Sequence, residues 1–110
     1  QILTVWNSKS KIQSEGDVFD PAKAAAMFPN GIGQIARPSD RSGPSSPRQV
    51  GRRSIEESIA YVIAAQRWAM EDTRLGIPIL FHEESLHGLA ARDATAFPQA
   101  IGLASTWDPA

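Results

Sequence analysis

The chain has 110 residues, a net charge of −1 at pH 7 and an apolar fraction of 42%, which is close to the average of globular domains and excludes a disordered tail. Eleven basic and twelve acidic side chains leave no global field to attract nucleic acid or an anionic membrane, so we expect neither partner. The sequence has no cysteine, which excludes disulfides and thiolate metal sites, and no apolar run approaches the roughly 20 residues of a membrane-spanning helix.

Residues 1–30 are predicted to form a lead-in segment and one helix. A short apolar start is followed by a polar stretch over residues 7–17. Asp20-Pro21 predicts the start of a helix, because aspartate is a preferred N-cap and proline is favoured at the first helical position. The alanine-rich stretch that follows has high helix propensity, and Pro29-Asn30-Gly31 is typical of a helix end.

A short strand and a long polar loop follow. Residues 32–36 are predicted to form the strand. The loop at 37–53 contains three prolines, four serines and five arginines. It is either a basic patch for phosphate or nucleic acid, or a solvated and partly mobile loop. We favour the solvated loop, because a binding patch normally interleaves aromatic side chains and this segment has none.

The next element is predicted to be an amphipathic helix that begins at Ser54 and ends near Thr73. Ser54 and Glu57 have the spacing of a capping box, in which each side chain bonds the other residue's backbone N–H. Apolar residues then follow helical spacing at Ile55, Ile59, Val62, Ile63, Ala69 and Met70. Gly76 supplies a left-handed end and Pro78 prevents continuation.

Residues 77–81 form a continuous apolar run, which is typical of a parallel strand buried on both faces. Together with the strand at 32–36 and the intervening helix, this run completes one β-α-β unit. The sequence therefore predicts an α/β fold with a parallel sheet that cannot close on itself within this chain.

Polar residues gather where this second strand ends: His82, Glu83, Glu84, Ser85 and His87. In parallel α/β folds, ligands bind at the carboxyl ends of the strands, so this cluster is a candidate site. The structural alternative is a helix-capping loop with solvated carboxylates. Consecutive residues of an extended chain point to opposite faces, so at most one of Glu83 and Glu84 should face a substrate, while the other should pack or cap a neighbouring element.

Other chemistries fit this cluster poorly. His82 and His87 are five residues apart, whereas the zinc protease signature requires two histidines at i and i+4 on one helix face, so we predict no metal site. Ser85 lacks the glycine-flanked elbow of a serine nucleophile. The sequence contains no glycine-rich phosphate loop or dinucleotide fingerprint, and we expect no cofactor.

Three segments resemble glycoside hydrolase family 3: residues 31–35, the stretch at 74–88 that ends in His87-Gly88, and the stretch at 95–108. The resemblance implies that residues 1–110 are part of that family's N-terminal domain, about the first two β/α units of a TIM-type (β/α)₈ barrel. Residues 1–30 would be a lead-in and helix. Residues 31–110 would hold strand one, a long loop, a helix, strand two and the start of the next helix.

The resemblance also implies a function. The family contains retaining exo-acting β-glycosidases that hydrolyse terminal non-reducing β-D-xylosyl or β-D-glucosyl residues, so a β-linked oligosaccharide or glycoside is the expected substrate. The family's nucleophile is an aspartate on a later barrel strand and its acid/base is commonly a glutamate of the following domain. We therefore expect no catalytic residue in this chain. The remaining barrel and a second domain are expected partners, and the family favours a periplasmic or secreted location.

One substrate-binding position carries over from the family, an acidic residue four positions before the glycine of the His-Gly pair, which here is Glu84. It is expected to bind hydroxyls of the non-reducing terminal sugar. Glutamate is commoner at this position in members that act on pentosides, which favours a xyloside, although the His-Glu-Glu variant occurs with either specificity. Asp108-Pro109 is typical of a helix start, so we expect the chain to be an internal segment of a longer protein.

The alternative is a non-catalytic carbohydrate-binding or structural fragment. A carbohydrate-binding module would need exposed aromatic side chains on one flat face. The three tryptophans are dispersed, and we expect each to be a packing residue: Trp6, Trp68 and Trp107.

Overall fold

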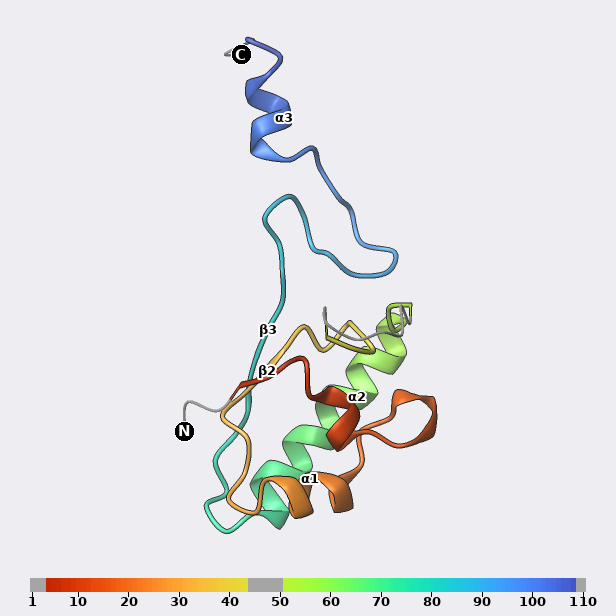
Figure 1. The fold of residues 1–110 in the computed structure, drawn as a ribbon, viewed down its shortest axis with the longest axis vertical. Helices are drawn as coiled ribbons and strands as arrows, with labels where there is room; N and C mark the ends of the chain where they lie inside the picture. Colours follow the sequence, from red (N-terminus) through yellow and green to blue (C-terminus); the bar gives the residue numbers. More distant parts are fainter. Residues whose placement is uncertain (1–3, 44–50, 109–110) are drawn as a thin grey trace.

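A small parallel sheet with two helices forms the body of the molecule, as the computed structural model shows for residues 4–43 and 51–108 (Figure 1). The helices and strands are, in chain order, β1 (Thr4–Val5), the 3₁₀ turns η1 (Lys9–Ile12) and η2 (Glu15–Asp17), α1 (Pro21–Met27), β2 (Gln34–Ala36), α2 (Ile55–Arg67), the π-helical turn η3 (Trp68–Asp72), β3 (Leu80–His82) and α3 (Ala100–Ala104).

The sheet has the order β1-β2-β3 and all its strands are parallel. The central strand β2 pairs Ile35 with Val5 on one side and with Phe81 on the other. The strand predicted at 32–36 is present in shortened form, and the one predicted at 77–81 is shifted to 80–82, so that His82 belongs to it. The helices and the parallel sheet are compatible with the predicted α/β class. Strand β1 was not predicted, because the lead-in segment was expected to supply only a helix.

Helix α1 begins as its sequence predicts. The Asp20 side chain accepts a hydrogen bond from the Lys23 backbone N–H at 3.0 Å, and Pro21 occupies the first turn. Phe19, just before this cap, lies in the core between two aromatic side chains of the second helix region. Its ring centroid is 5.9 Å from that of Tyr61 and 5.7 Å from that of Trp68. The start of α1 thereby fixes how the lead-in packs on α2.

Helix α2 has the predicted capping box at Ser54, whose Oγ accepts from the Glu57 N–H at 3.2 Å while the Glu57 carboxylate accepts from the Ser54 N–H at 2.7 Å. Of the apolar residues whose spacing indicated this helix, Ala69 is buried, whereas four are more than half exposed: Ile55, Ile59, Ile63 and Met70. The buried face consists of Tyr61, Ala65, Trp68 and Ala69. Apolar residues have helical spacing on both faces of α2, and which face is buried depends on the residues of the sheet that pack against it.

Strand β3 differs from its prediction. The continuous apolar run suggested burial on both faces, yet Leu80 is 60% exposed while Ile79 is buried. Among the described residues, no strand pairs with the far edge of β3, so β3 is an edge strand of the sheet. Ile79, just before β3, is anchored by the Gln66 side chain of α2, which donates to the Ile79 carbonyl and accepts from the Ile79 N–H, both at 2.8 Å.

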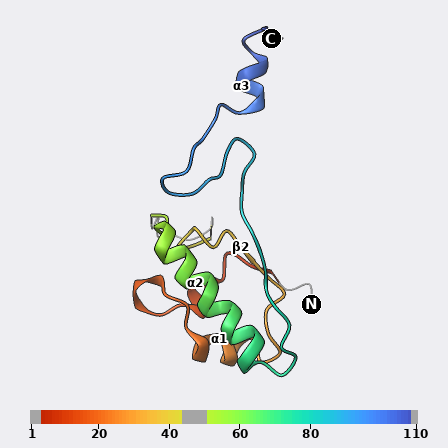
Figure 2. The same ribbon diagram turned by 180° about the vertical axis from the view of Figure 1, so that it is seen from behind.

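Beyond β3, residues 83–108 leave the body as an extended arm that ends in the short helix α3 (Figures 1 and 2). The chain measures 55 × 27 × 24 Å with a radius of gyration of 16.3 Å, against roughly 13 Å for a compact chain of this length. Trp68 is a packing residue as expected, but Trp107, on the arm, is 91% exposed. Within the described ranges, no helix is long and apolar enough to cross a bilayer.

Candidate functional site at the carboxyl edge of the sheet

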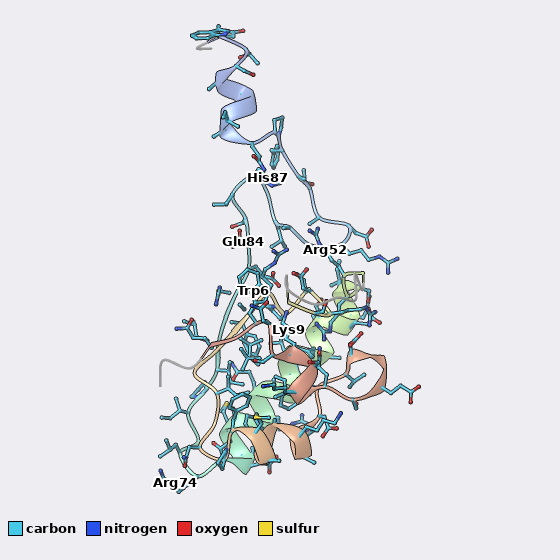
Figure 3. All side chains as sticks on the ribbon, in the orientation of Figure 1. Trp6, Lys9, Arg52, Arg74, Glu84 and His87 are labelled. Carbon is cyan, nitrogen blue, oxygen red and sulfur yellow. The ribbon has the colours of Figure 1, made fainter. Side chains whose placement is uncertain are left out.

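The three parallel strands end at one edge, and each is followed by polar or aromatic residues. Trp6 and Lys9 follow β1, the segment 37–40 follows β2, and Glu83-Glu84 follow β3. Figure 3 shows Trp6, Lys9 and Glu84 toward this end of the sheet, whereas Arg74, which precedes β3, lies at the opposite end. The topology therefore brings together groups that are distant in the sequence.

Two buried cations hold the segment after β2. Lys9 is fully buried, and its Nζ donates to the backbone carbonyls of Arg37 and, at 3.0 Å, Asp40. Burial, together with the nearby positive charge of Arg53, lowers the pKa of Lys9 from its ordinary 10.5 to about 8. Because a carbonyl dipole compensates a buried ammonium only in part, this lysine is poised to lose its proton under mildly alkaline conditions.

Arg53 is the second of these cations and is only 2% exposed. Its guanidinium donates to the carbonyls of Pro38 at 2.8 Å, of Asp40, and of Asp17 at 2.6 Å, and it lies 4.1 Å from the centroid of the Tyr61 ring. Burial lowers the pKa of Arg53, and burial raises the pKa of Tyr61 to about 12. Arg53 therefore serves the fold of the loop.

The expectation of a solvated loop at 37–53 is thus wrong for residues 37–43 and Arg53, whereas Gly51 and Arg52 are exposed. Ser39 and Arg53 are buried. Other arginines have acidic partners: Arg37 lies 2.9 Å from the Asp40 carboxylate, Arg52 lies 3.6 Å from it, and Arg41 lies 2.5 Å from Glu57. These ion pairs also argue against the alternative of a basic patch for phosphate. Residues 44–50 lie outside the described residues.

The two consecutive glutamates have different surroundings, as the extended backbone requires. Glu83 accepts hydrogen bonds from the Ser39 N–H at 2.8 Å and from the Ser39 hydroxyl at 2.9 Å, one to each carboxylate oxygen. These two hydrogen bonds join the end of β3 to the segment after β2. Glu84 is exposed and lines a cavity of about 740 Å³, together with Arg37, Arg52 and His87.

Apart from Arg37 and Arg52, the residues that line this cavity belong to the arm. The Phe97 N–H donates to the His87 carbonyl at 2.6 Å, and Gly88 bridges to Ala96. Gly88 has φ of +96°, and a Cβ there would lie 2.2 Å from the Thr95 carbonyl oxygen, so only glycine fits. The wall that this turn supports is built mainly of alanine and leucine side chains.

Arg37 is a site residue that the sequence analysis missed. It follows β2 directly, with the left-handed φ of +50°. Its N–H donates to the His82 carbonyl at 2.6 Å, and its guanidinium carbon lies 5.9 Å from the centroid of the Trp6 ring. Its place directly after a predicted strand could have indicated a site residue, but we considered it only as one of the five basic residues of the loop.

The remaining candidates do not assemble into another site. His82 and Ser85 are exposed, and no group of three or more His, Cys, Asp or Glu side chains in the described part of the chain could hold a metal ion.

Comparison with known proteins gives one finding. Residues 12–110 match the family model described as the glycosyl hydrolase family 3 N terminal domain. The match covers all three segments that carried the resemblance and extends through the lead-in to Ile12. No curated protein matches the chain at a significant level.

Proposed function

The chain belongs to glycosyl hydrolase family 3, and on that premise we propose that it forms part of the substrate-binding domain of a retaining exo-acting β-glycosidase. The enzyme releases terminal non-reducing β-D-xylosyl or β-D-glucosyl residues. In this proposal β2 and β3 belong to the early part of a (β/α)₈ barrel, and the remaining barrel and a second domain complete the active site.

The position of Glu84 carries the proposal. It lies just beyond β3, at the carboxyl edge of a parallel sheet, where α/β folds bind their ligands. Its side chain lines the cavity, whereas the carboxylate of Glu83 is occupied by Ser39. Of the two carboxylates at this strand end, Glu84 is therefore the one that is available to a sugar.

The chemistry of Glu84 suits that role. An ionised carboxylate has two acceptor oxygens and binds two sugar hydroxyls through short, charge-assisted hydrogen bonds. As the sugar ring flattens toward an oxocarbenium-like transition state, its hydroxyls become better donors. Contacts that strengthen in this way raise kcat as well as affinity.

The catalytic pair lies outside this chain in our proposal. A retaining mechanism needs two carboxyl groups about 5–5.5 Å apart, on either side of the scissile bond. Glu83 does not fit as the second group, because both its oxygens accept bonds from Ser39. An aspartate of a later barrel strand would be the nucleophile and a glutamate of the following domain the acid/base.

We place the substrate preference on the side of xylosides. The side chain of Glu84 is one methylene longer than the aspartate that most β-glucosidases of the family carry. It therefore extends into the space where a hexose keeps its hydroxymethyl group. A pentose, which lacks that group, leaves the carboxylate free to bind.

The test compares p-nitrophenyl β-D-xyloside and β-D-glucoside as substrates of the full-length enzyme that carries this domain. We expect hydrolysis with retention of anomeric configuration, and a larger kcat/KM for the xyloside. Glu84→Asp should shift the ratio toward the glucoside. Hydrolysis of neither substrate would refute the proposed activity, and a ratio that Glu84→Asp leaves unchanged would refute the proposed basis of specificity.

A further inference from the structure

Arg37 is the second polar residue of the Glu84 cavity whose position is fixed from several sides. Its left-handed backbone conformation is uncommon for a residue with a long side chain and is energetically unfavourable. Such a conformation persists only where the surroundings impose it. Here the N–H bonds to the His82 carbonyl of β3, and the carbonyl accepts from the buried Lys9 of the β1 side. Arg37 is thus held between its two neighbouring strands.

The guanidinium is fixed as well. The Asp40 carboxylate contacts Nε at 2.9 Å, and the Trp6 ring lies beside the group at 5.9 Å from its centroid. Asp40 is itself held, since its carbonyl accepts from both Lys9 and Arg53. The side chain of Arg37 is 18% exposed and lines the same cavity as Glu84. The contact with Asp40 is an ion pair at Nε, and four of the five guanidinium N–H donors are on the two terminal nitrogens.

Arg37 and Glu84 are chemically complementary. A carboxylate only accepts hydrogen bonds and a guanidinium only donates them, whereas a sugar hydroxyl does both. A donor and an acceptor along one cavity therefore recognise a polyhydroxylated ring better than two carboxylates would.

We propose that Arg37 is a substrate-contacting residue that donates a hydrogen bond to a hydroxyl of the same terminal sugar that Glu84 binds. This inference rests on the proposed glycosidase function. Arg37 donates to a hydroxyl oxygen and Glu84 accepts from hydroxyl groups, so together they select for a ring with several free hydroxyls.

The test uses the full-length enzyme, p-nitrophenyl β-D-xyloside, and the monodeoxy xylosides that each lack one ring hydroxyl. Arg37→Asn shortens the side chain, and asparagine tolerates the left-handed backbone. We expect it to lower kcat/KM for the parent xyloside by about 10- to 100-fold, the effect of losing a hydrogen bond to a charged group. For the one deoxy substrate that lacks the partner hydroxyl, the same change should cost less than about threefold, because that bond is already absent.

Arg41→Asn is the matched control, since Arg41 lies on the same loop, pairs with Glu57 and does not line this cavity. It should change kcat/KM by less than about twofold with every substrate. Arg37→Lys keeps the charge but loses the planar fork. It should give an intermediate loss with the same dependence on the deoxy substrate, and it serves the test if Arg37→Asn does not fold.

The outcomes separate the two proposals. If the wild-type enzyme hydrolyses no glycoside, the proposed function fails and this inference with it. If the wild type is active and the Arg37 variants match it, or lose the same factor with every deoxy substrate, Arg37 has no contact with the sugar and only this inference fails.

Discussion

Replacing Arg53 with methionine should loosen the segment after β2 without changing any residue that lines the Glu84 cavity. The substitution removes a donor from three carbonyls, of which the Asp40 carbonyl keeps its bond from Lys9 and the Asp17 carbonyl keeps one from the Gln13 side chain at 3.2 Å. The carbonyls of Pro38 and Asp17 lose the guanidinium, at a cost of about 1.5–2 kcal/mol each. Loss of the contact with the Tyr61 ring adds about 1 kcal/mol. Removal of a buried charge offsets part of this sum, so we expect a net loss of about 3 kcal/mol in local stability.

Hydrogen exchange of the full-length enzyme, followed by mass spectrometry, measures this loss. The backbone N–H groups of Arg37 and Asp40 are bonded to the His82 and Arg37 carbonyls. A loss of about 3 kcal/mol should raise their exchange rates by roughly a hundredfold, provided that exchange follows the opening equilibrium.

Arg41→Met is the matched control for this measurement. Arg41 pairs with the half-exposed Glu57 and donates to the Gly16 carbonyl at 3.1 Å, and neither contact holds the carbonyls of Pro38 or Asp40 that Arg53 bonds. The control should change exchange of the same segment by less than about fivefold. Wild-type exchange rates in Arg53→Met would refute the account in which a buried guanidinium holds this loop, and equal effects of the two variants would refute its assignment to Arg53.

Three further predictions follow from the same features. Because the pKa of Lys9 is lowered in the folded protein, the unfolded chain binds more protons than the folded one between pH about 8 and 10.5, so stability against urea should rise with pH across that window. The rise should be absent in Lys9→Met, and an identical rise in that variant would show that Lys9 is not its cause. Gly88→Ala places a Cβ against the Thr95 carbonyl at a positive φ, so it should lower kcat/KM at least tenfold by displacing the arm wall of the cavity, and wild-type kinetics would show that the arm is dispensable. The isolated 110-residue chain exposes apolar side chains on α2, β3 and the arm, so light scattering should detect its association, and the chain should not hydrolyse aryl xylosides. A cooperative thermal unfolding transition of a monomeric chain would contradict this prediction.

Elements defined by local chemistry could be predicted from the sequence. The caps at Asp20 and Ser54 depend on residues three positions apart, and both form as expected. The family register also follows from short contiguous segments. Strand β1, by contrast, is two residues long and is defined only by its pairing with β2, which the sequence around it does not encode.

The buried cations were missed for a similar reason. Lys9 bonds carbonyls that lie 28 and 31 positions away, and the most distant contact of Arg53 spans 36 positions. From the sequence alone, both residues are expected at the surface, because the carbonyls that compensate their burial come together only in the tertiary fold. The outward face of α2 has the same helical period as its core face, so spacing alone could not show that Ile59 lies outside.

The central claim is that Glu84 binds the sugar whereas Glu83 joins β3 to the segment after β2. The value of kcat/KM for the two alanine variants of the full-length enzyme tests it most directly. Glu84→Ala should lower kcat/KM for an aryl xyloside by roughly 30- to 1000-fold, with kcat reduced as well as KM raised, because a charged contact of the transition state is lost. Glu83→Ala removes the two bonds to Ser39 and should mainly lower thermal stability, with a smaller effect on kcat. A Glu84→Ala enzyme with near wild-type kinetics, beside a folded Glu83→Ala enzyme that is crippled, would contradict the account.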